Sequence, residues 1–240
     1  MIFSSVPFEY KPHLFRTKIS LILWLMDEPI EIARIRKEYT LQQLDETHLH
    51  PDPLHQFRFW FQEAVSAKVN EPNAMHLATL GDGNRVSGRI VLLKEIDTEG
   101  LQFFTNYQSR KGKEISQFPQ ASLTFFWAEL ERQVRIEGKI EKLSDELSDA
   151  YFKIRPREAQ IGAWASVQSA PVNRREQIEE AVIKLTEAFH DQEIQRPPFW
   201  GGYRLIPDYF EFWQGRPPRL HDRLCFEKQG SHWLIQRLYP

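Results

Sequence analysis

The sequence predicts an α+β domain built on a mostly antiparallel β-barrel, with a few helices at its periphery. Three observations indicate this class. Segments typical of strands follow one another through short links, which favours antiparallel pairing. Separate segments carry apolar residues at helical spacing. No Gly-x-Gly-x-x-Gly sequence follows a predicted strand, which argues against a dinucleotide-binding fold. The 240 residues, 41% of them apolar, are enough for one such domain.

Six to eight strands are expected from runs rich in β-branched and aromatic residues. The first two flank Gly81-Asp82-Gly83-Asn84, a strong turn signal, and are predicted to form a hairpin. The candidate strands are Ala74–Leu80, Val86–Ile96, Leu101–Thr105, Ala121–Trp127, Gln133–Leu143, Tyr209–Trp213, Leu224–Glu227 and His232–Leu238.

Three helices are expected around these strands. In the first, Asp52 is a suitable N-cap and Pro53 suits the first turn. The second begins at Ser144, where two acidic residues follow near the positive end of the helix dipole. The third covers about Arg174–His190, with apolar residues on one face. Residues 30–40 form a shorter amphipathic segment.

Composition excludes several classes of function. The net charge of −2 and a pI of about 6.5 do not suit a general nucleic-acid binder, which carries a strong basic excess. Cys225 is the single cysteine, so no intrachain disulfide forms and no cysteine cluster binds a metal. The apolar run Ile19–Met26 is too short to cross a bilayer, and Asp27-Glu28-Pro29 stands where a signal peptide needs small residues. We therefore expect a cytoplasmic protein with no membrane partner, no nucleic-acid partner and no metal.

Arg89-Ile90-Val91-Leu92-Leu93-Lys94 is the first candidate for binding chemistry. It is either a buried strand with a charge at each end, or a strand whose backbone meets a flat ligand while Arg89 and Lys94 hold anionic groups. Residues five apart point to opposite faces of a straight strand. Either the strand is therefore bulged, or the two side chains serve two different ligands.

The segment 104–113 reads as a strand end, a polar turn and the start of a helix. Free backbone N–H groups at a helix start, with Arg110 and Lys111 beside them, make a natural phosphate site. A solvated basic turn is the alternative.

Further along, Tyr151 and Arg155 share one helical face, and the guanidinium of Arg155 suits a phosphate. Tyr151 also suits core packing. Gln160–Ser169 reads as a loop, in which Gln168 and Ser169 can bind phosphate or ring edges.

The charges of Arg219-Leu220-His221-Asp222-Arg223 favour an anion site. If the run is extended, Arg219, His221 and Arg223 share a face, and such groups repel one another unless an anion lies among them. Trp213, just upstream, would add a stacking wall. A surface patch screened by water is the alternative.

Five separated motifs occur in an order that resembles the pyridoxamine 5′-phosphate oxidase family. They are Arg-Ile-Val-Leu-Leu-Lys, Ser-Arg-Lys-Gly, Arg-Pro-Arg-Glu-x-Gln-Ile-Gly, Phe-Trp-Gln-Gly and Arg-Leu-His-Asp-Arg, and the resemblance covers about Ile35–Pro240. It implies a split β-barrel, a homodimer with two FMN sites at its interface, and vitamin B6 chemistry. In that chemistry pyridoxine or pyridoxamine 5′-phosphate is oxidised to pyridoxal 5′-phosphate, and O2 takes the electrons to give H2O2.

The resemblance also implies a role for particular residues. Arg219 and His221 would be catalytic, near the C4′ atom from which a hydride passes to N5 of FMN. The cofactor would contact Arg89, Ile90, Val91, Leu92, Leu93, Lys94, Phe104, Thr105, Arg110, Lys111, Gln133, Gln168, Ser169, Trp213 and Arg223, with Arg110 and Lys111 on its phosphate. The substrate would contact Arg36, Tyr39, Lys94, Tyr151, Arg155, Arg219, Leu220 and His221.

Two residues depart from the family pattern. Ala159 stands where relatives usually have Ser, which removes one hydrogen bond to the substrate phosphate, worth about 1 kcal/mol. Phe104 replaces a Tyr of some relatives. Two rival functions fit parts of the pattern: a non-oxidase FMN protein of the same barrel class, which would not need Arg219, His221, Tyr151 and Arg155 together, and a flavin-free pyridoxal phosphate carrier.

The N-terminal part is expected to be separate from the domain. Residues 1–29 are predicted to be a disordered extension, and residues 30–240 a single FMN-binding split-barrel domain. Because the resemblance starts after Met26, a translation start at Met26 is a second interpretation.

Overall fold

The computed structural model describes residues 32–34 and 37–240. The chain divides into two units, 1–37 and 38–240. In the first unit a short 3-10 helix forms at Ile32–Arg34, within the segment expected to be amphipathic. The predicted extension at 1–29 lies outside the described residues, as does Arg36.

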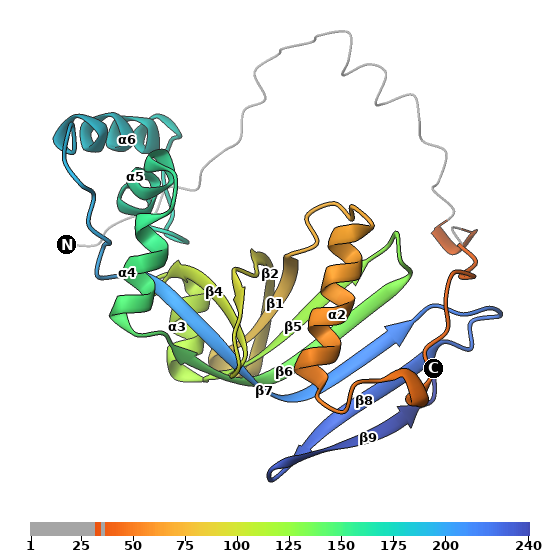
Figure 1. Ribbon diagram of the computed structural model, residues 1–240. Coiled ribbons are helices and arrows are strands. Elements are labelled where there is room, and N and C mark those ends of the chain that lie inside the picture. Colours follow the sequence, from red (N-terminus) through yellow and green to blue (C-terminus); the bar gives the residue numbers. More distant parts are fainter. Residues whose placement is uncertain (1–31, 35–36) are drawn as a thin grey trace, which may run out of the picture. The chain divides into compact units, whose positions relative to one another are not determined.

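The second unit is built on one antiparallel sheet (Figure 1). Its strands pair in the order β2-β1-β5-β6-β7-β4-β3, and β8 and β9 continue from β7 on a separate branch. The strands are β1 (Ala74–Gly81), β2 (Arg85–Leu92), β3 (Glu95–Ile96), β4 (Leu101–Asn106), β5 (Gln120–Trp127), β6 (Arg132–Lys142), β7 (Trp200–Gln214), β8 (Asp222–Gln229) and β9 (His232–Leu238). The predicted barrel-based α+β class is confirmed, and each predicted strand lies within or overlaps an observed one.

Strand β7 organises this sheet. Its first half pairs with β4, its second half pairs with β8, and β6 runs beside nearly all of it. We predicted only its last part, Tyr209–Trp213. Pro207 lies inside the observed strand, where the register with β6 shifts between Glu137 and Gly138. A proline is tolerated at such an irregularity because no regular ladder bond is required of it there.

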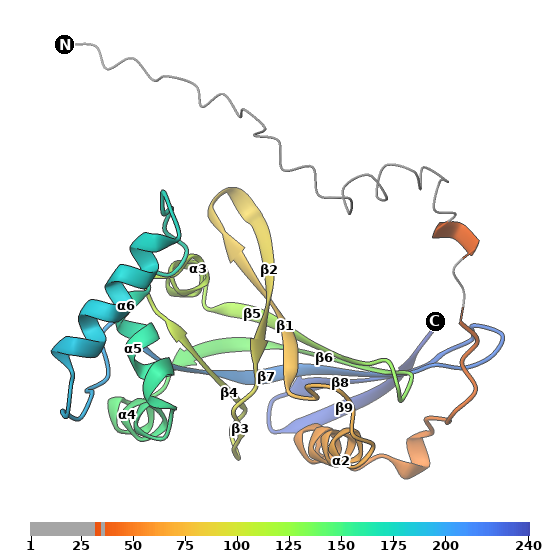
Figure 2. The ribbon, with the colours of Figure 1, turned by 90° about the horizontal axis from the view of Figure 1, so that it is seen from above.

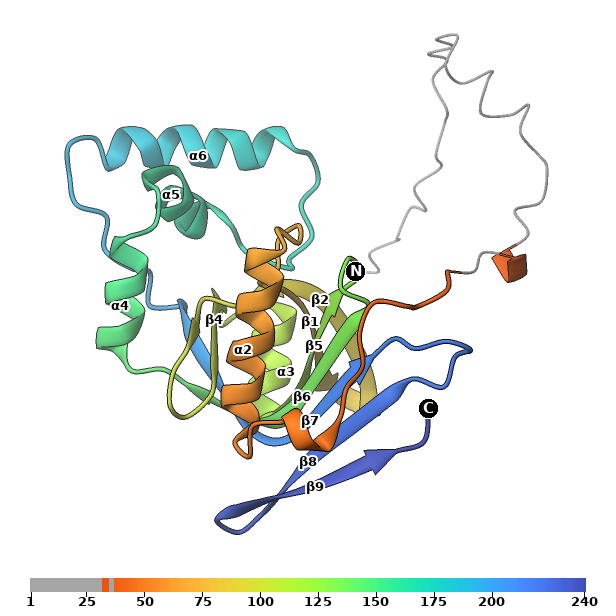
Figure 3. The same cartoon turned by 45° about the vertical axis from the view of Figure 1, so that its right-hand side comes forward.

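Five α-helices surround the sheet: α2 (Pro53–Ser66), α3 (Arg110–Gln117), α4 (Asp145–Lys153), α5 (Arg157–Ala165) and α6 (Glu176–Ala188). The main core lies under α2, where Phe57 packs on Phe125 and Trp60 on Phe212. The other helices gather where β4 meets the start of β7 (Figure 2). A smaller core forms there around Phe152. None of the described side chains of α6 is buried, and this helix lies outside α5 (Figure 3).

Local sequence signals explain where the helices begin. The Asp52 side chain accepts hydrogen bonds from the backbone N–H groups of Leu54 and His55, and Pro53 follows it, as predicted. Ser144 caps α4 through the N–H of Leu147. The loop expected at Gln160–Ser169 is wrong for its first half, because those residues belong to α5. The apolar side chains of Ile161 and Ala163 are buried in the smaller core and stabilise the helix.

Among the described residues, no helix is long and apolar enough to span a membrane. The same part of the chain holds no group of three or more His, Cys, Asp or Glu side chains placed to bind a metal ion.

Candidate functional site

A cavity of about 670 Å³ lies between β2, β4 and the α4–α5 region. It collects most of the residues predicted for the first half of the site. Those that line it are Arg89, Ile90, Val91, Leu92, Lys94, Phe104, Thr105, Lys111, Tyr151, Arg155 and Gln168. Leu93 belongs to the buried core instead, so a cofactor contact by this residue would have to use its backbone.

Arg89 and Lys94 reach the same cavity because the predicted strand Val86–Ile96 is broken. β2 ends at Leu92, and the N–H of Lys94 then donates to the carbonyl of Gln102 in β4, at 2.9 Å. The chain thus passes from β2 toward β4, and the strict alternation of a straight strand does not apply. The strand is therefore irregular, as the first alternative has it, and the second alternative, that the two side chains serve two different ligands, stays a prediction.

Cations in the cavity are held by a buried carboxylate. Glu114, on α3, forms ion pairs with Arg89 at 3.1 Å and with Arg110 at 2.8 Å. Burial alone would raise the pKa of Glu114, but hydrogen bonds from Ser87, Thr79 and the two arginines outweigh it and lower the pKa to about 2.

Lys111 is buried beside this pair. Its Nζ donates to Thr105 Oγ1 at 3.2 Å, and Thr105 Oγ1 donates to Gln168 Oε1 at 3.2 Å. Burial lowers the pKa of Lys111, and the positive charge of Arg89 lowers it further. An anion in the cavity would offset both the burial of the charged amine and its repulsion by Arg89. The arrangement therefore suits a phosphate or another anionic ligand.

Arg155 carries the clearest sign of an absent anionic partner. Its Nη1 is buried and has no hydrogen-bond partner among the described residues. The guanidinium lies 4.4 Å from the centroid of the Trp200 ring, and burial lowers the pKa of Arg155. Beside it, the rings of Tyr151 and Phe104 stack at 3.8 Å. Tyr151 therefore combines the two predicted roles, packing and cavity lining.

Ala159 lines this cavity and a second one of about 400 Å³ that shares Arg155, Gln168 and Trp200 with it. The departure from the family pattern is thus placed next to Arg155, where a phosphate-binding hydroxyl would be useful.

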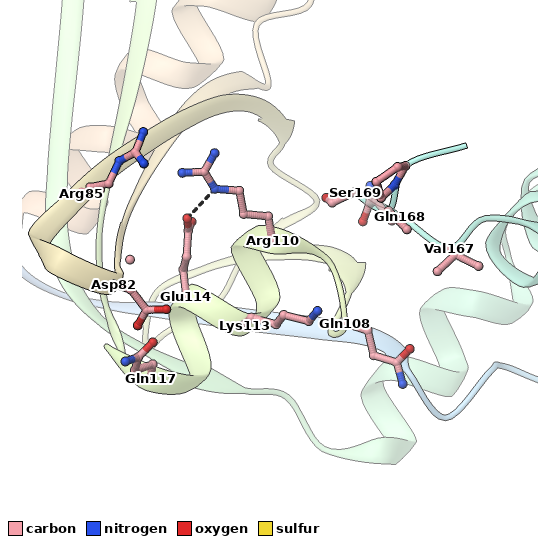
Figure 4. Close-up of a pocket in the computed structure, with 13 residues that line it drawn as sticks. Asp82, Arg85, Gln108, Arg110, Lys113, Glu114, Gln117, Val167, Gln168 and Ser169 are labelled. Atoms are coloured by element: carbon pink, nitrogen blue, oxygen red, sulfur yellow. Dashed lines mark hydrogen bonds and ion pairs between the residues drawn. The ribbon is translucent and has the colours of Figure 1, made fainter. Parts of the chain in front are cut away.

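Arg110 and Ser169 lie in a neighbouring groove of about 630 Å³ (Figure 4). Gln168 lines the groove as well as the main cavity. Arg110 and Lys111 are predicted to hold one phosphate. Arg110 lines the groove and Lys111 lines the main cavity, and Gln168 lines both.

The second half of the predicted site lies at the other end of β7. There Trp213 packs against His221, with ring centroids 4.7 Å apart. The edge of the Tyr39 ring meets both, at 5.5 Å from Trp213 and 5.4 Å from His221. Gln133 is the β6 register partner of Trp213. The ring of Tyr39 lies so close to Gly215 that an added Cβ there would be 2.6 Å from the Tyr39 Cγ.

Backbone hydrogen bonds fix the segment that carries Tyr39. Glu131 Oε2 accepts from the N–H groups of Thr40 and Leu41, at 2.8 and 3.2 Å. Asp222 Oδ2 accepts from the N–H of Leu44 at 3.1 Å. The segment after Tyr39 is therefore held by two carboxylates, one before β6 and one at the start of β8.

His221 is held in one neutral form. The backbone N–H of Arg216 donates to its Nδ1 at 3.0 Å, so the neutral ring carries its proton on Nε2. Burial lowers the pKa of His221 and the charge of Arg219 lowers it further, against the opposing effect of Asp222. His221 is thus arranged to donate a hydrogen bond from Nε2.

The run Arg219–Arg223 is not the extended face that we expected. Arg219 has a φ of 82°, and β8 begins only at Asp222. Arg223 pairs with the buried Glu211 at 2.9 Å and donates to the carbonyl of Tyr239. Glu211 therefore neutralises Arg223 without a bound anion, whereas the charge of Arg219 still acts on His221. Leu220 is 68% exposed.

The two halves of the site do not meet within one chain. Trp200 pairs with Asn106 at the start of β7, whereas Trp213 pairs with Gln133 near its end. Twelve residues of strand lie between the two tryptophans, so thirteen steps of about 3.3 Å separate them by roughly 43 Å along the strand.

Sequence reasoning missed Glu114 and Trp200. The spacing of Arg110 and Glu114, four apart at a helix start, was an available signal for the first. For Trp200, which precedes two glycines and stacks near Arg155, we find no local signal.

Family models match most of the second unit. Residues 61–188 match the model described as pyridoxamine 5′-phosphate oxidase, and residues 200–240 match the one described as the pyridoxine 5′-phosphate oxidase C-terminal dimerisation region.

Several relatives are named pyridoxine/pyridoxamine 5′-phosphate oxidase. The protein of Cyanothece sp. (strain PCC 7425 / ATCC 29141) is 53% identical over 211 residues, which are 88% of this chain and 99% of the relative. That of Actinobacillus pleuropneumoniae serotype 3 (strain JL03) is 52% identical over 211 residues, 88% of this chain and 100% of the relative.

Solved structures agree with this match. PhzG from Burkholderia lata 383, in complex with tetrahydrophenazine-1-carboxylic acid, has a TM-score of 0.80 at 30% identity, and the match covers 85% of this chain and 100% of PhzG. A pyridoxamine 5′-phosphate oxidase-related, FMN-binding protein of Nostoc punctiforme has a TM-score of 0.63 at 17% identity, over 80% of this chain and 99% of its own, and supports the fold alone. The chain therefore belongs to the pyridoxamine 5′-phosphate oxidase family, the FMN-dependent enzymes that produce pyridoxal 5′-phosphate.

Proposed function

We propose that the working enzyme is a homodimer, in which the cavity of one subunit is completed by the Trp213–His221 end of the other. The observation that carries this proposal is the separation of the two half-sites at opposite ends of β7. The region that matches a dimerisation model, residues 200–240, contains Trp213, Arg219, His221 and Arg223. Two copies related by a twofold axis would form two equal composite sites.

The residues present fit FMN. Arg89 and Lys111 line the main cavity, Arg110 lies in the adjoining groove, and the lining carries flat aromatic and aliphatic surfaces. The buried Nη1 of Arg155, which no described residue bonds, adds a second anion-binding position, suited to the phosphate of a B6 vitamer. When bound, FMN would act as the electron acceptor through its flavin ring.

The chain's own side chains bind and orient the substrate. Lys94, Tyr151 and Arg155 would hold its phosphate, and Tyr39 with Trp213 would exclude water from one side of its ring. His221 donates a hydrogen bond from Nε2, and Arg219 places a positive charge near the reacting carbon. In this arrangement His221 orients the substrate rather than removing its proton, because its Nδ1 is already occupied by the Arg216 N–H.

The substrates would be pyridoxine and pyridoxamine 5′-phosphates, with O2 as the final acceptor and H2O2 as product. We also propose a cytoplasmic location, on the ground that a single cysteine, Cys225, forms no intrachain disulfide.

The purified protein should be yellow and release FMN on denaturation, as identified by mass spectrometry. It should form pyridoxal 5′-phosphate and H2O2 in equal amounts from each substrate. Substituting Arg219→Ala or His221→Ala should reduce this turnover. A flavin-containing protein without this activity, or normal turnover in both variants, would contradict the proposal.

A further inference from the structure

Glu114 is a buried carboxylate that connects two predicted cofactor residues from different elements. Its Oε2 accepts hydrogen bonds from Thr79 Oγ1 at 2.6 Å, Ser87 Oγ at 2.7 Å and Arg89 Nη2 at 3.1 Å. Its Oε1 accepts from Arg110 Nε at 2.8 Å. The Glu114 side chain is 8% exposed, so these bonds form with little competition from water.

The hydrogen bond to Glu114 fixes the orientation of the Arg110 guanidinium. Because Nε is used by the carboxylate, both Nη groups of Arg110 are left without a hydrogen-bond partner in the part of the chain that the structure describes. The guanidinium lies in the groove and points toward the side of Arg85, and Gln168 and Ser169 line the same groove (Figure 4). The Arg110 side chain is 59% exposed and would sample many rotamers without this bond. A fixed fork with two free Nη groups is the geometry that binds phosphate with two bonds.

The charges around Glu114 suit a phosphate as well. Arg89, Arg110 and Lys111 contribute three positive charges and Glu114 one negative charge, which leaves two positive charges. A phosphate monoester carries about −1.5 to −2 at neutral pH. Glu114 therefore reduces the repulsion among the cations without cancelling the attraction for the ligand.

We propose that Glu114 is a positioning residue for the flavin phosphate: it fixes Arg89 and Arg110 so that Arg110 presents both Nη groups to that phosphate. This inference rests on the proposed function, in which FMN occupies this cavity. Glu114 itself does not contact the ligand.

The test is the binding of FMN and of riboflavin, which lacks the phosphate, to the flavin-free full-length protein. Flavin fluorescence reports both dissociation constants. In Glu114→Gln we expect the FMN constant to rise about tenfold, the equivalent of about 1.4 kcal/mol. The riboflavin constant should stay within about twofold, because the ring contacts are unchanged. Glu63→Gln is the matched control, since Glu63 also pairs with an arginine, Arg132 at 2.6 Å, but outside the cavity.

Two other outcomes would overturn the inference. If Glu114 acted only through its charge, its removal would tighten FMN binding. If it only held α3 against the β1–β2 hairpin, FMN and riboflavin would weaken equally and the melting temperature would fall with them.

A double-mutant cycle identifies the residue through which Glu114 acts. Arg110→Gln alone should weaken FMN at least as much as Glu114→Gln, and the double variant should be no weaker than Arg110→Gln. Additive effects would contradict the proposed route. If Glu114→Gln does not fold, Ser87→Ala removes one donor and keeps every charge. It should weaken FMN by about threefold and leave riboflavin unchanged, in line with the loss of one hydrogen bond. No change in either ligand would again overturn the inference.

The wild-type protein separates this inference from the proposed function. A wild type that binds FMN no better than riboflavin would refute phosphate binding at this site. A wild type that prefers FMN, with an equal preference in Glu114→Gln, would refute only the role of Glu114.

Discussion

The two ends of β7 satisfy their polar groups in different ways. At the cavity end, no described residue bonds the buried Nη1 of Arg155, and the buried Lys111 donates to the hydroxyl of Thr105. At the other end, Arg223 is paired with Glu211, and the Nδ1 of His221 is occupied by a backbone N–H. The cavity end thus presents buried cationic groups to a ligand, whereas at the far end Arg223 and the Nδ1 of His221 are already fixed by partners within the chain.

This difference suggests a division of work. A buried cation without a partner costs free energy that an anionic ligand recovers on binding, so the cavity end should supply most of the affinity. Side chains already fixed by their neighbours lose little freedom on binding, so the far end should supply orientation. The predictions below test whether the two ends belong to different subunits and whether their roles differ in this way.

The largest expected effect is the recovery of activity in a heterodimer in which one subunit has a defect at the cavity end and the other subunit has a defect at the far end. Arg155→Ala and Arg219→Ala should each lower kcat/KM by about 10- to 100-fold, the loss expected for a charge-assisted hydrogen bond. A heterodimer of the two variants, isolated by two different affinity tags, should recover about half of the wild-type activity, because one of its two composite sites is intact.

A heterodimer of two cavity variants, Arg155→Ala with Lys111→Ala, is the control. Each of its sites has one defect, so it should stay inactive. If the Arg155→Ala and Arg219→Ala heterodimer were equally inactive, the two ends would serve the same subunit and the composite site would be wrong.

The pH dependence tests the fixed form of His221. Because its pKa lies below the usual 6.5, kcat/KM should be level near neutral pH and fall about tenfold per unit only below that pKa. The free energy of unfolding should fall in the same direction. The contribution of neutral His221 to stability is fully present above pH 6.5 and is lost as the pH falls through the lowered pKa. In that range the unfolded state binds more protons than the folded state. NMR titration of the His221 ring gives the pKa directly.

Arg219→Gln should raise this pKa toward 6.5, because the charge of Arg219 is one cause of its lowering. An acid limb above pH 6.5 in the wild type, or no shift in the variant, would show that His221 is not held neutral as inferred.

The sequence predicted the positions of strands and helices better than it predicted which distant side chains pair with each other. Alternating and β-branched runs identified the strands, and Asp52-Pro53 identified the start of α2, because these signals are local. The separation of the half-sites depends on the length of β7, of which the sequence predicted only the last part, Tyr209–Trp213. The pairing of Arg223 with Glu211 joins β8 to β7 and leaves no local signal in the run Arg219–Arg223.

Gly215 allows a moderate test of the orienting end. Gly215→Ala would place a Cβ 2.6 Å from the Tyr39 Cγ and displace that ring from Trp213 and His221. Two aromatic contacts are worth about 1–3 kcal/mol together, so we expect KM to rise roughly tenfold and the protein to be less stable. Both are measurable by steady-state kinetics and thermal unfolding.

The control for the backbone change is Gly162→Ala in α5, where nothing lies within 4 Å of the added Cβ. Replacing a helical glycine should stabilise the protein by about 1 kcal/mol. If Gly215→Ala were equally stabilising, Tyr39 would not occupy the place that the structure gives it.

The smallest effect is expected where the cavity end can be improved. Ala159 borders the space beside Arg155, and Ala159→Ser would add a hydroxyl able to bond a phosphate oxygen there. One hydrogen bond is worth about 1 kcal/mol, so KM for the phosphorylated substrates should fall by about fivefold with little change in kcat. Ala165→Ser, at the end of α5 and outside both cavities, is the matched control and should leave KM unchanged. The direction of the change in KM tests the difference proposed between the two ends of β7. A lower KM means that the cavity end still lacks a partner for its ligand, whereas a higher KM would mean that its polar groups are already complete and that the added hydroxyl only competes for space.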